Sequence, residues 1–204
     1  MSHDLQLARR DSEYTNLALG EPVFLQEAME WHRIPTDYWA GYSPLYPALG
    51  GDPRLTDMLH QRHSESHVVV ANGAKQALLA TMYAYRVTGK KSVYHKAPYW
   101  PSYPTIAKLS QMRFVKKPNE NSVIVTTAPN NPDGGYGGPK KCDIWDAVYA
   151  SDIYGWQYEK RPDYEVAIYS AAKMFGLSSL RIGWLVTDNK DIADLAAYYV
   201  EAVS

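Results

Sequence analysis

The sequence predicts an α/β fold in three layers, in which helices enclose a mostly parallel sheet of about seven strands. Short apolar segments typical of buried strands recur along the chain, and several are separated by segments with helical spacing of apolar residues. Polar or glycine-containing residues follow most of these strand patterns. That arrangement is typical of a parallel sheet whose carboxyl edge binds a ligand.

Helices are predicted where start and stop residues flank a periodic pattern. Asp52 before Pro53 marks the start of a helix through GDPRLTDMLHQRH, and Gly89 ends a second helix that begins near Asn72. A third helix, DIADLAAYYVEAV, has no obvious packing partner in the sequence. The predicted strands are HVVVA, SVYHK, MRFVK, SVIVTT, CDIWDA, EVAIYS and IGWLVT.

Composition excludes several classes of protein. With 204 residues, 46% of them hydrophobic and 21% charged, the chain can bury one core, and its net charge of −1 favours neither nucleic acid nor a membrane surface as a partner. Cys142 is the single cysteine, so no intrachain disulfide forms, and we expect it in the core. No membrane span or secretory signal is evident, and a cytoplasmic location is expected.

The residues that follow the predicted strands form a chemically consistent set. They include a helix start at Asn72-Gly73-Ala74-Lys75 that suits an anion, the rings of APYWPSYP, the segment APNNPDG, the carboxylate of Asp146 and the amine of Lys173. Lys173 alone could equally be a surface lysine. Together, these groups are those that pyridoxal 5′-phosphate requires: an amine, a carboxylate for its ring nitrogen and donors for its phosphate.

The motifs NGAKQAL, APYWPSY, APNNPDG, DAVY, SAAK and LRIGW, in this order, resemble those of the fold-type I pyridoxal-phosphate-dependent aminotransferases. NNPDG followed shortly by a strand ending in D-x-x-Y is most similar to the branch that contains plant alliinases and tryptophan aminotransferases. The resemblance runs from about Leu19 to the end of the chain. It implies an amino-terminal arm and loops over residues 1–45, a cofactor-binding domain over 46–190 and a terminal helix over 191–204.

The resemblance implies roles for the residues that bind the reactive part of the cofactor. Lys173 matches the Schiff-base lysine, which also moves the substrate proton, and Asp146 matches the carboxylate that pairs with the ring nitrogen. Tyr149 and Asn131 match residues that bond the phenolic oxygen, and Trp100 matches the stacking ring. Asp152, in SDIY, is a rival for the role of Asp146, but CDIWDA is the better strand. Asn131 as a turn cap and Trp100 as a core residue remain alternatives.

The remaining matches concern the phosphate, the substrate and a second subunit. Gly73, Ala74 and Lys75 would bind the phosphate through backbone N–H groups. Ser170 and Arg181 would complete this phosphate site. Tyr46 matches a tyrosine that reaches the phosphate of the neighbouring subunit, which implies a homodimer with shared active sites. Gly20, with Trp100 and Asn131, would contact the substrate.

The sequence departs from the family pattern at its end, because the family continues into a small domain that carries the arginine for the substrate carboxylate. A compact variant, an isolated cofactor domain and one product of a split gene all fit this departure. The helix between NPDG and the D-x-x-Y strand is reduced to GGYGGPKK. We expect an aminotransferase that acts on an amino acid, with aromatic ones suggested by the many rings. The alternatives are a lyase or decarboxylase on the same scaffold and a non-catalytic cofactor-binding module.

Three histidines, His60, His63 and His67, have a loosely metal-like spacing. They straddle a predicted helix end and lack a supporting run of ligands. We therefore expect a solvated face here and no bound metal.

Overall fold

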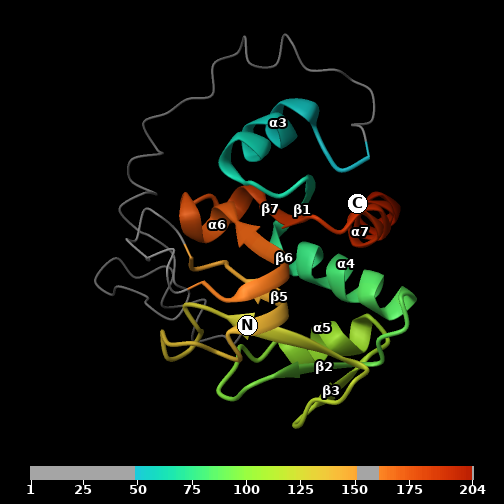
Figure 1. Ribbon diagram of the computed structural model, residues 1–204. Helices are drawn as coiled ribbons and strands as arrows, with labels where there is room; N and C mark the ends of the chain where they lie inside the picture. Colours follow the sequence, from blue (N-terminus) through green and yellow to red (C-terminus); the bar gives the residue numbers. More distant parts are fainter. Residues whose placement is uncertain (1–48, 151–160, 204) are drawn as a thin grey trace.

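The computed structural model describes residues 49–150 and 161–203, and these residues form a seven-stranded sheet with helices on its faces (Figure 1). The order of the strands across the sheet is β1-β7-β6-β5-β4-β2-β3. The strands are β1 (His67–Asn72), β2 (Ser92–His95), β3 (Arg113–Val115), β4 (Ser122–Thr127), β5 (Lys141–Asp146), β6 (Asp163–Ser170) and β7 (Ile182–Thr187). The helices are α3 (Pro53–Arg62), α4 (Gly73–Val87), α5 (Tyr103–Leu109), α6 (Ala171–Met174), the 3₁₀ turn η5 (Ser178–Leu180) and α7 (Lys190–Val203). The predicted fold class is confirmed.

Strand β7 runs antiparallel to both of its neighbours, and every other pair of neighbouring strands is parallel. Strands β1 to β6 therefore all point the same way. Their carboxyl ends lie along one edge of the sheet, together with the beginning of β7. This edge is the one that the sequence predicts to hold the functional residues.

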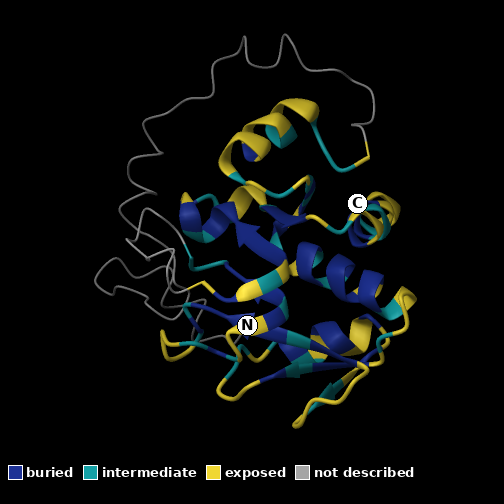
Figure 2. Cartoon of the chain, viewed as in Figure 1, coloured by how far each residue is buried: buried dark blue, intermediate teal, exposed yellow. Residues whose placement is uncertain are grey.

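Most residues of the central strands are buried (Figure 2), and apolar side chains form a core on each face of the sheet. One face supplies Val93, Val125, Ile144 and other aliphatic side chains to a core that is covered by α4, α5 and α7. The other face packs against Leu59 of α3 and the short helix α6 and is rich in rings. Its aromatic residues are Trp145, Tyr164, Tyr169 and Trp184.

Helix α7 packs beside α4, although its sequence suggested no partner. Its buried residues include Ile192 and Ala196, which belong to the same core as the buried face of α4. The rings of Tyr83 on α4 and Tyr199 on α7 lie 4.8 Å apart between centroids. The partner of the last helix is thus the helix that follows β1, a contact between segments far apart in the chain.

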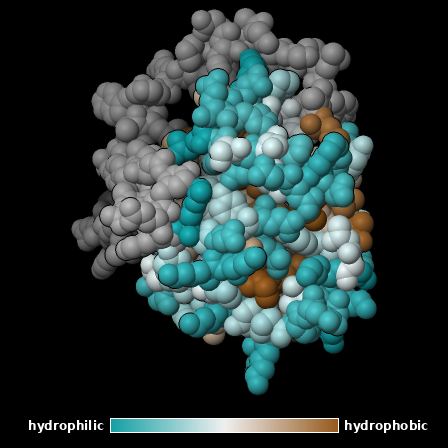
Figure 3. All heavy atoms as spheres, viewed as in Figure 1, coloured by the Kyte–Doolittle hydropathy of each residue, from teal (hydrophilic) through white to brown (hydrophobic). Residues whose placement is uncertain are grey.

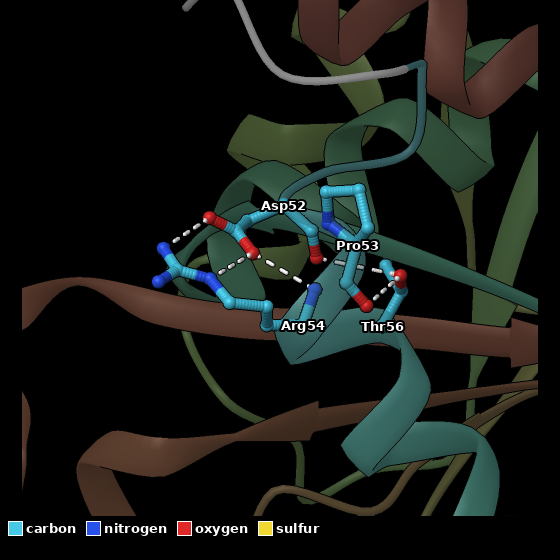
Figure 4. A network of polar contacts seen from close by, with 4 residues as sticks. All are labelled: Asp52, Pro53, Arg54 and Thr56. Atoms are coloured by element: carbon cyan, nitrogen blue, oxygen red, sulfur yellow. Dashed lines mark hydrogen bonds and ion pairs between the residues drawn. The ribbon is translucent and has the colours of Figure 1, made fainter. Parts of the chain in front are cut away.

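Helix α3 begins where the sequence predicts, and a local network fixes its start (Figure 4). The backbone N–H of Arg54 donates to Asp52 Oδ1 at 2.9 Å, and the Arg54 guanidinium pairs with Asp52 Oδ2 at 3.0 Å. Pro53 occupies the first turn, where no backbone donor is needed. A side-chain cap of this kind stabilises a helix by about 1 kcal/mol.

His63 corrects the expectation of a solvated histidine face. Its Nε2 accepts a hydrogen bond from Trp184 Nε1 at 3.0 Å, and its ring centroid lies 4.6 Å from that of Tyr169. His63 is therefore part of the aromatic layer, whereas His60 is exposed. Within residues 49–150 and 161–203, no group of side chains is placed to hold a metal ion.

The segment between β4 and β5 contains no helix, in agreement with the sequence, and two glycines let it run close to β4. A methyl group on Gly138 would lie 2.6 Å from Thr126 Oγ1, and one on Gly137 would lie 2.3 Å from Asn130 Oδ1. Gly137 N–H donates to Thr127 O at 2.8 Å. Because the loop follows the strand so closely, β5 can enter the sheet directly beside β4 without a crossover helix.

The face shown in Figure 3 is mostly hydrophilic, with apolar residues in small separate patches. Among the described helices, none combines the length and apolarity needed to cross a bilayer.

Gly183 provides a test of the packing between β7 and α4. A methyl group at this position would lie 2.4 Å from Ala74 N, so a side chain would force the strand and the helix apart. We expect Gly183→Ala to lower the free energy of unfolding by about 1–3 kcal/mol, measured by urea denaturation. Gly135→Ala is the control, because a methyl there meets no atom closer than 3.6 Å. Equal stability of the two variants would contradict this packing.

Cys142 provides a test of the ring-rich face of the sheet. The thiol is 8% exposed, and burial raises its pKa to about 12. Since the thiolate is the reactive form, a thiol reagent at pH 8 should label the protein only after unfolding. Rapid stoichiometric labelling of the native protein would show that this face is open.

Candidate active site at the carboxyl edge of the sheet

The register of the sheet places the ends of the parallel strands side by side. Asp146, the last residue of β5, is paired with Thr127 on one side and Ile168 on the other. On the neighbouring strand β6, Ser170 is paired with Gly183 of β7, next to the pair of Asn72 on β1 and Ile182 on β7. The edge therefore brings together residues from the whole chain between β1 and β7.

Asp146 is a buried carboxylate with few partners. It is 6% exposed, its Oδ2 lies 2.5 Å from the Tyr103 hydroxyl, within hydrogen-bonding distance, and its Oδ1 accepts a hydrogen bond from Val148 N–H at 3.3 Å. Burial raises the pKa of Asp146, and the hydrogen bonds only partly oppose this shift. A cationic N–H group beside Asp146 would favour its ionised form. The protonated nitrogen of a pyridine ring is such a group.

Behind Asp146 lies a chain of hydrogen-bonded side chains that the sequence analysis missed. The Tyr103 hydroxyl is 2.5 Å from Thr127 Oγ1, which is 2.9 Å from His95 Nε2. Burial lowers the pKa of His95 to about 4, and burial together with the charge of Asp146 raises the pKa of Tyr103. Thr127 and His95 each end a strand, so the rule that located Asp146 would also have located them.

Asn131, Tyr149 and Lys173 lie together although they come from three different segments. Asn131 Nδ2 donates to the Tyr149 hydroxyl at 3.2 Å, and Lys173 Nζ is 5.9 Å from the centroid of the Tyr149 ring. Burial and the charge of Asp146 raise the pKa of Tyr149. An amine, a phenol and an amide thus occupy the same part of the edge as the buried carboxylate.

Ser170 and Lys173 are positioned by the short helix α6. The hydroxyl of Ser170 accepts a hydrogen bond from Ala172 N–H at 3.2 Å and so caps this helix, which carries Lys173 one turn later. The predicted phosphate ligand is therefore also a structural cap. Lys173 is half-buried.

The start of α4 has the features of an anion site. Its N-cap residue, Asn72, makes no side-chain cap bond, so the amides of Gly73, Ala74 and Lys75 depend on another acceptor. The guanidinium of Arg181 lies against this helix start, because a methyl on Gly73 would be 2.6 Å from its Nη2. Arg181 has a left-handed backbone with φ 55° and donates through Nη1 to Ser178 O at 3.2 Å.

Trp100 connects the anion site with the carboxylate. Lys75 Nζ is 5.2 Å from the centroid of the Trp100 ring. The centroid of the Tyr103 ring lies 5.6 Å from that of Trp100, and the two rings meet edge-on. Trp100 is half-buried, so part of its ring faces outward. This placement leaves a ring surface for a planar ligand between the helix start and Asp146.

Three of the residues considered in the sequence lie outside the described part of the chain: Gly20, Tyr46 and Asp152. Asp146 is the last residue of β5.

The donors and acceptors along this edge fit pyridoxal 5′-phosphate. Uncapped amides and a guanidinium suit its phosphate, the Asn131–Tyr149 pair suits its phenolic oxygen, and the buried carboxylate suits its ring nitrogen. The amine of Lys173 suits its aldehyde.

Comparisons with solved structures show the same fold in two aminotransferases and a decarboxylase. A methionine aminotransferase from Escherichia coli superimposes with a TM-score of 0.67 at 17% identity, covering 98% of this chain and 65% of that one. An aspartate aminotransferase from Rhizobium meliloti gives 0.60 at 16% identity, over 90% of this chain and 56% of that one. The L-threonine-O-3-phosphate decarboxylase of Porphyromonas gingivalis gives 0.58 at 21% identity, over 87% and 59%.

Sequence comparisons agree with the fold. Tryptophan aminotransferase-related protein 2 of Arabidopsis thaliana is 26% identical over 150 residues, which are 66% of this chain and 34% of that protein. Its counterpart from Oryza sativa subsp. japonica is 26% identical over 155 residues, 66% of this chain and 31% of that protein. This chain therefore spans about a third of the length of these relatives. The family model described as Allinase matches residues 60–204, so the chain belongs to the Alliinase_C family of fold-type I, pyridoxal-phosphate-dependent aminotransferase-like proteins.

Proposed function

We propose that this chain forms the cofactor-binding part of a pyridoxal-phosphate-dependent aminotransferase, with Lys173 as the lysine that binds the cofactor aldehyde. The observation that carries the proposal is that the Lys173 amine and the Asn131–Tyr149 pair occupy the same sheet edge as buried Asp146. These groups come from separate segments, and packing of the core does not require their chemistry. Their convergence is what a site for an aldehyde on a pyridine ring needs.

In this proposal, the other residues of the site bind the cofactor and fix its orientation. The start of α4 and Arg181 bind the phosphate, which fixes the position of the ring. Trp100 covers one ring face and excludes water, while the Tyr149 hydroxyl and Asn131 amide orient the phenolic oxygen. When bound, the cofactor supplies an aldehyde that condenses with amines and a ring that accepts electrons.

Asp146 and Lys173 act on protons and charge. The Asp146 carboxylate holds a positive charge at the ring nitrogen inside a site of low dielectric, where such a charge pair acts most strongly. The amine of Lys173 acts as a general base when it takes the proton from the substrate Cα. The same amine acts as a general acid when it gives that proton up again. Both tasks depend on side chains held by the ends of neighbouring strands.

Amino transfer is favoured over other reactions by the relatives named tryptophan aminotransferase-related. The same names support aromatic amino acids as substrates. A lyase or decarboxylase is the second candidate, because a decarboxylase shares the fold. A cofactor-binding module without turnover is the third.

We further propose that residues 1–45 form an arm, that residues 46–190 form the cofactor domain and that residues 191–204 form a terminal helix. The proposed assembly is a homodimer. In it, Tyr46 contacts the phosphate of the partner's site, and Gly20 closes over the substrate. The substrates would be an amino acid and a 2-oxo acid.

Lys173→Ala tests covalent attachment of the cofactor. We expect the purified protein to show the absorbance of lysine-bound pyridoxal phosphate, and we expect that band to be lost in the variant, which has no amine at this position. Lys108→Ala, at an exposed lysine of α5, is the control and should keep the band. Absence of the band from the parent protein at saturating cofactor would refute the proposal.

Asp146→Asn tests the charge at the ring nitrogen. We expect turnover to fall on the order of a hundredfold, while affinity for the cofactor changes much less, because the charge matters most in the transition state. The exposed Asp191→Asn is the control. A variant with unchanged turnover would show that another group, such as Asp152, has this role.

Titration with the twenty amino acids separates the three candidate functions. Conversion to the pyridoxamine spectrum with release of an oxo acid is the expected result and identifies amino transfer. Ammonia or carbon dioxide as the product would instead identify the lyase or decarboxylase. An unchanged spectrum with every amino acid would identify the binding module.

A further inference from the structure

The hydrogen-bonded chain behind Asp146 has more side-chain contacts than hydroxyl protons to fill them. Its members are Asp146, Tyr103, Thr127 and His95, and all of them are buried, with exposures of 6%, 0%, 2% and 2%. The chain runs from the end of β5 through the start of α5 to the ends of β4 and β2. Its far end is closed by a backbone carbonyl, since His95 Nδ1 lies 2.7 Å from Lys96 O.

The Lys96 carbonyl determines which nitrogen of the His95 imidazole carries a hydrogen. A carbonyl oxygen only accepts hydrogen bonds, so His95 Nδ1 carries a hydrogen and donates it to Lys96 O. In a neutral ring, Nε2 is then an acceptor, and Thr127 must donate to it across 2.9 Å.

Three contacts link the four groups, and each needs one proton. If Asp146 is ionised and His95 is neutral, only the hydroxyl protons of Tyr103 and Thr127 are present. Tyr103 then donates to Asp146 and Thr127 donates to His95, so the contact between Tyr103 and Thr127 has no proton. Two oxygens 2.5 Å apart without a proton between them repel each other, and no water reaches them. The chain is therefore complete only with one additional proton.

That proton can occupy either end. With the proton on Asp146, the carboxyl donates to Tyr103, Tyr103 donates to Thr127, and Thr127 donates to neutral His95. With the proton on His95, every donor points the other way and Asp146 is ionised. The two arrangements have the same number of atoms and the same net charge, and they differ by one proton shift within each contact.

We propose that Asp146, Tyr103, Thr127 and His95 form a proton wire that shares one proton, so that His95 is a positioning residue that sets the charge of Asp146. This inference rests on the proposed function only in assigning Asp146 to the ring nitrogen. The wire lets the carboxylate become ionised when a cationic ring is bound and neutral when it is not. No proton has to enter from solvent.

Surrounding groups indicate where the proton resides in the cofactor-free protein. Burial disfavours the charged forms at both ends, lowering the pKa of His95 and raising that of Asp146. The charge of Asp133 acts in the opposite direction on His95, whose ring also faces Tyr103 at 4.9 Å and Tyr99 at 6.0 Å. Both shifts favour the arrangement with a protonated Asp146 and a neutral His95 in the cofactor-free protein.

Magnetic resonance of the whole chain without cofactor tests the wire directly. With ¹⁵N-labelled histidine and ¹³Cγ-labelled aspartate, we expect His95 at neutral pH to be uncharged, with its hydrogen on Nδ1. Raising the pH should remove the shared proton in one step, seen with the same midpoint at Asp146 and His95. A hydrogen on Nε2, or different midpoints, would overturn the proposal.

Thr127→Val removes the central hydroxyl with little change of shape. We expect the pH-dependent change of the His95 ¹⁵N signals to disappear in this variant, while the ¹³Cγ signal of Asp146 still titrates. Thr127→Ser keeps a hydroxyl and should restore the common midpoint. Thr81→Val is the matched control, since the Thr81 hydroxyl is fully buried within α4, donating to Ala77 O at 2.8 Å. A common midpoint that persists in Thr127→Val would refute the wire.

Failure of the wire and failure of the proposed function are distinguishable. The resonance experiment needs no cofactor, whereas the loss of colour in Lys173→Ala depends on the cofactor alone. Adding pyridoxal phosphate to the labelled protein should shift the proton toward His95, and this shift should be absent in Tyr103→Phe. An identical shift in that variant would also overturn the proposal.

Discussion

The structure depends on the burial of one carboxylate, Asp146, at the end of a central strand. Its neighbours on β4 and β6 are fixed by the sheet register, so its position cannot change without disrupting the core. An ionised carboxylate is costly at such a place unless a charge or a hydrogen-bond network compensates for it. The Tyr103 hydroxyl, the chain of polar side chains behind it and a cationic ligand in front can together provide that compensation.

The parallel direction of six strands gathers the other groups around this carboxylate. The relatives with amino-transfer and decarboxylase names share this scaffold, and the TM-scores of 0.58 to 0.67 show that the strand arrangement persists at low identity. A common scaffold does not determine which bond of the substrate breaks.

Much of the fold could be predicted from the sequence, because strand composition, helix caps and the residues after strands are local features. All seven strands, the Asp52 cap and the reduced connection after NPDG were predictable in this way. Contacts between distant segments were not. The partner of α7, the packing of His63 on Trp184 and the link from His95 to Asp146 each depend on residues brought together only by the sheet.

The place of β1 in the sheet has a consequence for how the chain folds. Among the strands of residues 49–150 and 161–203, β1 comes first in the chain, yet its ladder partner is β7, so His67 meets Thr187 only after most of the chain has been made. During synthesis, β2 to β6 can associate with each other before the ladder between β1 and β7 forms. Such a long separation in sequence slows folding, because the β1 ladder is completed only after β7 has emerged from the ribosome.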